Sequence, residues 1–169
     1  MNDGAVTRQV LWHHMTYRKG KTMHTRMTVV TMVLLYVASG SALARDTKYM
    51  LPIDAALNTP AAKDKLGTAV AFYFGDQAHP KVAQTLGVYT TNHKTNAFNK
   101  SDQEACEWAF LSALLSLRDR AVREGGDAVI NIKSYYKKSV VVSNIEYECH
   151  AGALIGGVAL QGTVVKLAK

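Results

Sequence analysis

Three histidines follow residue 44, and imidazole is the commonest side-chain ligand of transition metals. They are His79, His93 and His150, and they lie far apart in the sequence. A shared metal site would need the fold to bring all three together. Because scattered histidines are usually surface residues, we treat a metal site from these three as the weaker alternative.

Two carboxylates stand two residues apart, at Glu146 and Glu148. In an extended strand, side chains at this spacing share one face. A carboxylate pair of this kind could act as a general acid and base. A solvated strand face is the commoner explanation of the same pattern.

A short run combines aromatic and basic side chains, as proteins that bind single-stranded nucleic acid do. It consists of Tyr135, Tyr136, Lys137 and Lys138. One such patch is a weak signal, and the tips of hairpins often have this composition. We keep the four residues as a candidate interaction patch and do not assign a nucleic-acid partner to it.

The standard catalytic motifs are absent from the sequence. There is no G-x-x-x-x-G-K-[ST] phosphate loop, no H-E-x-x-H zinc motif and no G-x-S-x-G nucleophile elbow. The glycines at 152, 156, 157 and 162 form no dinucleotide fingerprint, and bulges or close packing explain them better. We therefore expect neither catalytic residues nor a cofactor.

Composition and charge place the chain among ordinary globular proteins. The 169 residues are 48% hydrophobic and 20% charged, which suits a single domain with an appendage. The net charge is +7, but residues 1–44 contribute +4 and residues 45–169 only +3. Since more than half of the excess lies in the first quarter of the chain, the charge does not favour nucleic-acid binding.

Residues 1–44 have the pattern of a leader with a signal peptide. A basic stretch, Arg18 to Arg26, precedes an apolar run of 11 residues, Thr28–Ala38, and small residues end at Ala44. The run is shorter than the roughly 20 residues that span a bilayer. Met23 or Met27 is the better start. We expect cleavage after Ala44 and a periplasmic or secreted protein with no transmembrane segment after processing.

The first part of the remaining chain is expected to contain two strands. Residues 45–66 contain Pro52 and Pro60 and are expected to be irregular, with one helical turn at 54–57. Residues 67–169 are expected to form a single domain. It begins with strands at 68–74 and 85–91, and a loop is expected at 92–100.

The strongest element follows Ser101. Ser101 and Glu104 form a capping box, and Gly125 and Gly126 end the pattern, which predicts a helix of about 23 residues. The helix carries one apolar stripe, made of Cys106, Phe110, Ala113, Leu114, Leu117 and Ala121. A second apolar stripe is made of Trp108, Leu111, Leu115 and Val122. A helix with this much apolar surface fills a deep groove on a sheet or packs against another protomer.

Three further strands are expected at 127–136, 139–150 and 158–167, with Lys137 and Lys138 in the first turn. Links of hairpin length favour antiparallel pairing. The sequence therefore predicts an α+β fold, with one long helix packed on a mostly antiparallel sheet of about five strands.

The two cysteines are predicted to form a structural disulfide. Cys106 lies on the apolar stripe of the helix, and Cys149 lies on the apolar face of a strand, so both point into one core. An exported chain meets an oxidising compartment, where such a bond persists. A catalytic thiol at Cys149 with His150 is disfavoured, because neighbours in a strand point to opposite faces.

Three segments carry a resemblance to a known family. They are Ala128–Ile132 after the Gly-Gly helix end, Tyr147–Gly152 and Gly157–Gly162. Over most of residues 50–169 the chain resembles a family of small exported proteobacterial proteins. Some members carry an automatic label as an excinuclease or as the ATPase of one. The sequence does not support that role, because the ATP-binding loop and the zinc cysteines are missing.

The order of one helix and three strands is also similar to two other groups. One is the YbjQ-like family, which is associated with heavy-metal binding and forms rings. The other is the periplasmic domain of the lipoprotein that senses envelope stress for the Rcs phosphorelay. That sensor acts by protein contacts, but this chain lacks its lipid-bearing cysteine.

We expect a non-catalytic exported binding or protein-interaction module. Its partner would be an envelope protein or a small ligand, and a homo-oligomer is an open possibility. A periplasmic protein of metal binding or metal stress is the alternative. A small hydrolase using Glu146 and Glu148 is a third hypothesis.

Overall fold

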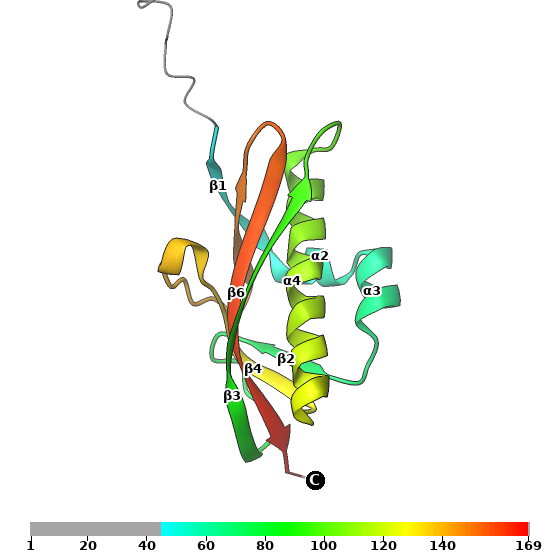
Figure 1. Ribbon diagram of the computed structural model, residues 1–169, viewed down its shortest axis with the longest axis vertical. Helices are drawn as coiled ribbons and strands as arrows, with labels where there is room; N and C mark the ends of the chain where they lie inside the picture. The colour runs from blue at the N-terminus through cyan, green and yellow to red at the C-terminus, as the bar shows by residue number, and fades with distance from the viewer. Residues whose placement is uncertain (1–44, 169) are drawn as a thin grey trace, which may run out of the picture. The chain divides into compact units, whose positions relative to one another are not determined.

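A computed structural model describes residues 45–168 (Figure 1). The leader predicted for residues 1–44, with its start at Met23 or Met27 and its cleavage site, lies outside the described residues. The strands are β1 (Thr47–Pro52), β2 (Ala71–Phe74), β3 (Val82–Asn96), β4 (Ala128–Ser134), β5 (Glu146–Ala151) and β6 (Ile155–Leu167). The helices are α2 (Ile53–Leu57), α3 (Pro60–Leu66), α4 (Asp102–Glu124) and the 3-10 helix η1 (Tyr136–Lys138).

One curled sheet contains all six of these strands, and β6 is at its centre. One edge of β6 pairs with β3 over the whole length of β6. Its other edge is divided, since β5 pairs near Gly156 and Gly157 and β4 pairs from Leu160 to Val165. β1 extends the sheet beyond β5, and β2 extends it beyond β4. All pairings are antiparallel except that of β2 with β4.

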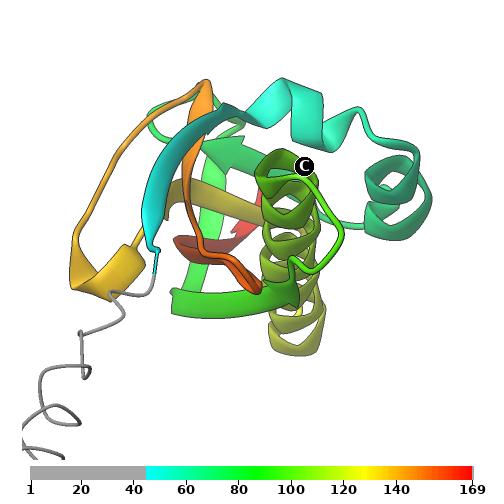
Figure 2. The same ribbon diagram turned by 90° about the horizontal axis from the view of Figure 1, so that it is seen from above.

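The predicted fold class is confirmed: the protein is α+β, with one long helix on a mostly antiparallel sheet. Helix α4 lies along the sheet, and α2 and α3 lie on the same side (Figures 1 and 2). The sheet has one strand more than expected, because β1 joins it.

Residues 45–66 are more regular than the sequence suggested. They form β1, α2 and α3, where we expected irregular chain with one turn. In the described structure β1 is an edge strand that pairs with β5 alone, about 100 residues away, and its Tyr49 and Leu51 side chains pack against the core. Pro60 is the first residue of α3, a position where its missing N–H costs nothing. Proline therefore starts a helix here and does not interrupt one.

The connection between β4 and β5 also differs from the prediction. The expected hairpin with a turn at Lys137 and Lys138 does not form, because β4 and β5 pair with successive parts of the same edge of β6. Residues 139–145 are not in a strand, and β5 begins at Glu146. A single bridge, Ser134 to Val141, fixes the start of this connection.

Helix α4 has the predicted bounds, and one of the two bonds of the predicted capping box is present. The Ser101 hydroxyl accepts a hydrogen bond from the N–H of Glu104 at 3.0 Å, and Gly125 takes a left-handed conformation with φ of 76°. All six residues of the first apolar stripe are buried. In the second stripe Leu111 is buried, whereas Trp108 and Val122 are exposed.

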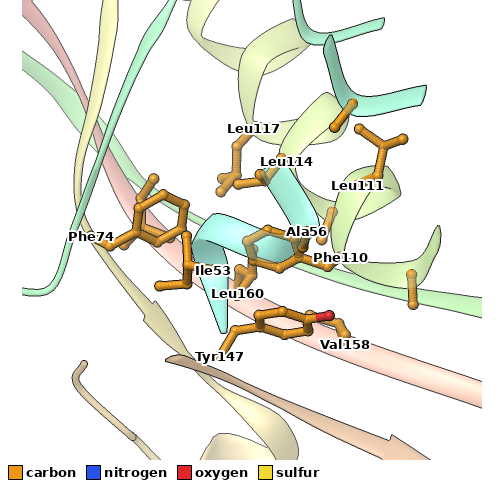
Figure 3. Close-up of a cluster of buried hydrophobic side chains, with 14 of the residues drawn as sticks. Ile53, Ala56, Phe74, Phe110, Leu111, Leu114, Leu117, Tyr147, Val158 and Leu160 are labelled. Carbon is orange, nitrogen blue, oxygen red and sulfur yellow. The ribbon is translucent and has the colours of Figure 1, made fainter. Parts of the chain in front are cut away.

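Aromatic side chains form the centre of the core (Figure 3). The rings of Phe110 and Tyr147 stack with centroids 4.0 Å apart, and the centroid of the Phe74 ring lies 6.0 Å from that of Phe110. Leu114, Leu117, Val158 and Leu160 are also fully buried here. Burial of this apolar surface holds α4 against the sheet.

The two cysteines lie within disulfide distance, as predicted. Their sulfur atoms are 2.00 Å apart and their Cα atoms 5.8 Å apart. The bond joins the first turns of α4 to β5. Among the described residues, no helix is both long and apolar enough to cross a membrane.

Candidate functional site

Two groups of polar side chains lie on opposite faces of the sheet. The first surrounds His150 on the face that points away from α4. We call it the outer-face cluster, and its members are Asp46, Lys48, Tyr136, Lys137, Glu148 and His150. The strand alternation explains its position, because Tyr147 and Cys149 point into the core, so Glu148 and His150 point outwards.

His150 faces a carboxylate at each ring nitrogen. Its Nδ1 is 2.9 Å from Asp46, and its Nε2 is 2.8 Å from Glu148. The Tyr136 ring stacks on the imidazole with centroids 3.6 Å apart. Only a protonated imidazole can donate to both carboxylates, since the neutral ring carries one N–H.

Each acid of the cluster also has a basic partner. The Oε2 atom of Glu148 is 2.9 Å from the Lys48 ammonium, and Asp46 is 3.2 Å from Lys137. Burial opposes ionisation of Glu148, but Lys48 and His150 outweigh it, so its pKa is below the usual value. The hydrogen bond from Lys137, opposed by burial and helped by His150, also lowers the pKa of Asp46. Each acid of this cluster therefore has a basic partner, while Oε2 of Glu148 has an ion pair with Lys48 but no hydrogen bond among the described residues.

The second group lines a cleft between β3 and α4, which we call the β3–α4 cleft. Its volume is about 300 Å³. β3 contributes five consecutive residues, from Tyr89 to His93, and α4 contributes Ser116, Arg120 and Arg123. The spacing of these three helix residues puts them on one face of α4, because positions three and four apart are neighbours on a helix.

The floor of the β3–α4 cleft carries hydroxyl groups and an imidazole. The Ser116 hydroxyl and Nε2 of His93 share a hydrogen bond of 2.7 Å. The Thr91 hydroxyl is buried and has no hydrogen-bond partner among the described residues. A buried hydroxyl without a partner carries a cost of about 1–3 kcal/mol.

Arg120 and Tyr89 form one end of the cleft. The Arg120 guanidinium lies over the Tyr89 ring, 4.6 Å from its centroid, and pairs with Glu124 at 3.1 Å. Burial, with an added contribution from Glu124, raises the pKa of Tyr89. The Tyr89 ring folds back over Gly87, where a Cβ atom would lie 3.0 Å from its hydroxyl. The aromatic face and the cation thus form one fixed surface.

The chemistry available in the cleft is that of holding an anion. The guanidinium groups of Arg120 and Arg123 can donate hydrogen bonds to an anion, and the bonded pair of Ser116 and His93 lies in the same lining. A serine hydroxyl beside an imidazole is also the arrangement of an activated nucleophile. In the described structure, however, no carboxylate bonds to Nδ1 of His93 to orient the ring for that role.

The three histidines of the proposed metal site lie in three separate places. His79 bonds to the carbonyl of Pro80 in the loop before β3, His93 lies in the β3–α4 cleft, and His150 belongs to the outer-face cluster. Within residues 45–168, no group of three or more His, Cys, Asp or Glu side chains is arranged to hold a metal ion.

The other predicted residues divide in the same way. Tyr136 and Lys137 of the interaction patch join Glu148 and His150, which the sequence had suggested for other reasons. Glu146 is exposed, and no side-chain bond joins it to Glu148. Tyr135 and Lys138 belong to neither group.

Sequence reasoning missed most of the β3–α4 cleft. Thr91 and His93 fall where strand and loop were expected to meet, so their shared face could not be recognised. The sequence placed Ser116 and Arg123 on the polar strip of the helix and Arg120 among the basic residues of its last turns, without joining the three. Their spacing of four and three residues was the available signal.

No protein-family model matches the chain, and no curated protein is significantly similar to it.

Proposed function

We propose that this protein is a non-catalytic binding and protein-interaction module, exported from the cytoplasm, which holds an anionic group of its partner in the β3–α4 cleft. One observation carries the proposal: Arg120 and Arg123 line the helix wall of the cavity, and no acid among the described residues lies at ion-pair distance from Arg123. Carboxylate or phosphate oxygens would accept hydrogen bonds from both guanidinium groups.

The cleft suits this role better than the outer-face cluster does. In the outer-face cluster each carboxylate already has a basic partner within 3.2 Å. Binding there would require breaking an existing ion pair. In the cleft, no described acid lies at ion-pair distance from Arg123, and only Glu124 pairs with Arg120. The Arg123 guanidinium can therefore bind a ligand without breaking an ion pair of the described structure.

An anion titration followed by NMR tests the proposal. Acetate and inorganic phosphate are added to the purified protein, with glycerol as the uncharged control. We expect saturable shifts of the amides at 89–93 and 116–123 with the anions alone. The variant Arg120→Gln/Arg123→Gln should lose the response.

A matched variant controls for net charge. Lys63→Gln/Lys65→Gln removes two charges from the exposed surface of α3 and should leave the shifts unchanged. Equal responses to glycerol and anions, or equal responses of the two double variants, would refute the proposed function.

The metal alternative is not adopted, because no shared site joins its three candidate histidines in the described structure.

A further inference from the structure

Strand β3 has one edge that pairs with nothing in the described structure. Its 15 residues pair with β6 along one edge, and no other strand pairs with it. In an antiparallel ladder, alternate residues of an edge strand direct their N–H and C=O groups away from the partner. Such a row of unpaired groups is a template for another strand.

The part of this edge beside α4 is regular. Two register shifts occur in β3, between Val82 and Gln84 and between Thr85 and Gly87, and none interrupts the pairing from Val88 to Asn96. Bulges protect edges by bending them away from a new strand. Residues 88–96 lack that protection.

The β3–α4 cleft follows the backbone of this edge. Five consecutive β3 residues line it, including Thr90 and Asn92, whose side chains are exposed and alternate away from α4. Their contribution to the wall therefore comes largely from the main chain. A strand added to β3 would direct every second side chain into the cleft, towards the helix wall.

The charge of the helix wall selects the side chains that fit. Arg120 and Arg123 face the cleft, Glu124 offsets one of them, and His93 adds a titratable donor. Acidic side chains at alternate positions of the added strand would meet the two guanidinium groups. A second copy of this chain fits poorly, because pairing β3 with β3 would bring both pairs of arginines to one interface.

We infer that β3 residues 88–96 accept an extended acidic segment of a partner protein as an additional antiparallel or parallel strand, with its acidic side chains in the β3–α4 cleft. This inference rests on the proposed function and names the class of its partner. Main-chain hydrogen bonds would supply much of the affinity, and the arginines would supply the preference for acidic side chains.

The test uses three short capped peptides and the purified protein. In the first peptide, glutamate alternates with threonine, and in the second, glutamine replaces glutamate. The third keeps the glutamates but carries N-methyl groups on alternate backbone nitrogens along one edge, with both edges tried in turn. Fluorescence anisotropy measures affinity, and sedimentation velocity of the protein alone measures self-association.

We expect the glutamate peptide to bind and the glutamine peptide to bind at least about tenfold more weakly. Methylation of one edge should abolish binding, and methylation of the other should not. The variant Arg120→Gln/Arg123→Gln should bind the glutamate peptide about tenfold or more weakly than the wild type does. The variant Lys63→Gln/Lys65→Gln should keep the wild-type affinity.

Other results would overturn the inference in distinguishable ways. If all methylated peptides bind as well as the parent, the acidic groups bind without strand addition. If no peptide binds but acetate and phosphate still shift the cleft amides, the strand inference fails and the proposed function stands. If neither peptides nor anions bind, both fail. If the protein self-associates through β3, the edge belongs to a second copy.

Discussion

The two histidines of the polar groups differ in what their ring nitrogens face. His150 has a carboxylate at each nitrogen and a stacked tyrosine above the ring. His93 has a single bond, to the Ser116 hydroxyl, and lies in a cavity. The first arrangement fastens Asp46 and η1 to β5. In the second arrangement, Nδ1 of His93 has no side-chain partner in the described structure, so it can bond to a ligand.

Tyr147 gives a prediction about stability. Its ring is buried, and its hydroxyl has no hydrogen-bond partner in the described part of the chain. Burial is also the main reason that its pKa is raised. Tyr147→Phe removes this cost, so we expect unchanged stability or a gain of about 1 kcal/mol in urea unfolding. A loss of about 1 kcal/mol or more would mean that the hydroxyl has a partner.

Asp102 gives a prediction about pH. Hydrogen bonds from Arg45 and Tyr49 lower its pKa, so the folded state favours the charged carboxylate. Its contribution is therefore complete above the usual carboxyl pKa and is lost as the pH falls through the folded-state value. We expect Asp102→Asn to destabilise the protein near pH 7, and the difference from wild type to shrink towards about pH 2.

Asp64→Asn serves as the control for this pH dependence. Asp64 is exposed on α3, and no side-chain hydrogen bond or ion pair involves it in the described structure. Urea unfolding across the pH range should separate the two variants. If the difference in unfolding free energy between the wild type and Asp102→Asn stays constant with pH, the lowered pKa of Asp102 is contradicted.

At the scale of elements, the sequence predicted what local chemistry determines. Helix α4 was predicted with its bounds, since Ser101 caps it and Gly125 ends it. The strand alternation that puts Cys149 inside and His150 outside was also predicted correctly. These features depend on neighbours within a few residues.

The missed elements depend on distant partners. β1 forms because β5 accepts it, and residues 92–96 belong to β3 because β6 pairs with them. The loop expected at 92–100 is therefore confined to residues 97–100. On the helix-facing side of β3, Tyr89, Thr91, His93 and Thr95 alternate with exposed residues, so the pattern has the period of a strand but not its usual apolar character. Three of these residues, Tyr89, Thr91 and His93, line the β3–α4 cleft, so the residues that made the strand hard to predict also form the site.

β6 offers a matched pair of glycine substitutions. A Cβ atom at Gly162 would lie 2.6 Å from Cγ1 of Val129, whereas at Gly157 the nearest atom is 3.7 Å away. We expect Gly162→Ala to cost about 1–3 kcal/mol by overpacking. Gly157→Ala should change stability little or increase it, because alanine lowers the entropy of the unfolded chain. Equal effects in urea unfolding would contradict the packing described for β6.

At the scale of the whole domain, the disulfide ties α4 to β5. The bond closes a loop with a sequence separation of 43 residues. We expect Cys106→Ala/Cys149→Ala to lower the free energy of unfolding by about 2–5 kcal/mol. Binding in the β3–α4 cleft should survive below the new melting temperature, because the sulfurs lie on the first turns of α4 and not in the cleft.

Thiol labelling checks the bond directly. The denatured, unreduced protein should show no reactive thiol. Two free thiols, or a variant that loses binding without losing stability, would mean that the cysteines act in binding and not in folding.

Hydrogen exchange of the backbone amides, measured with and without the glutamate–threonine peptide, tests the central claim most directly. The claim is that the edge of β3 and the adjoining face of α4 form the binding surface. We predict that the peptide slows exchange at residues 88–96 and leaves exchange in the outer-face cluster unchanged. Slower exchange at 134–150 with no change at 88–96 would contradict the account and assign binding to the outer-face cluster instead.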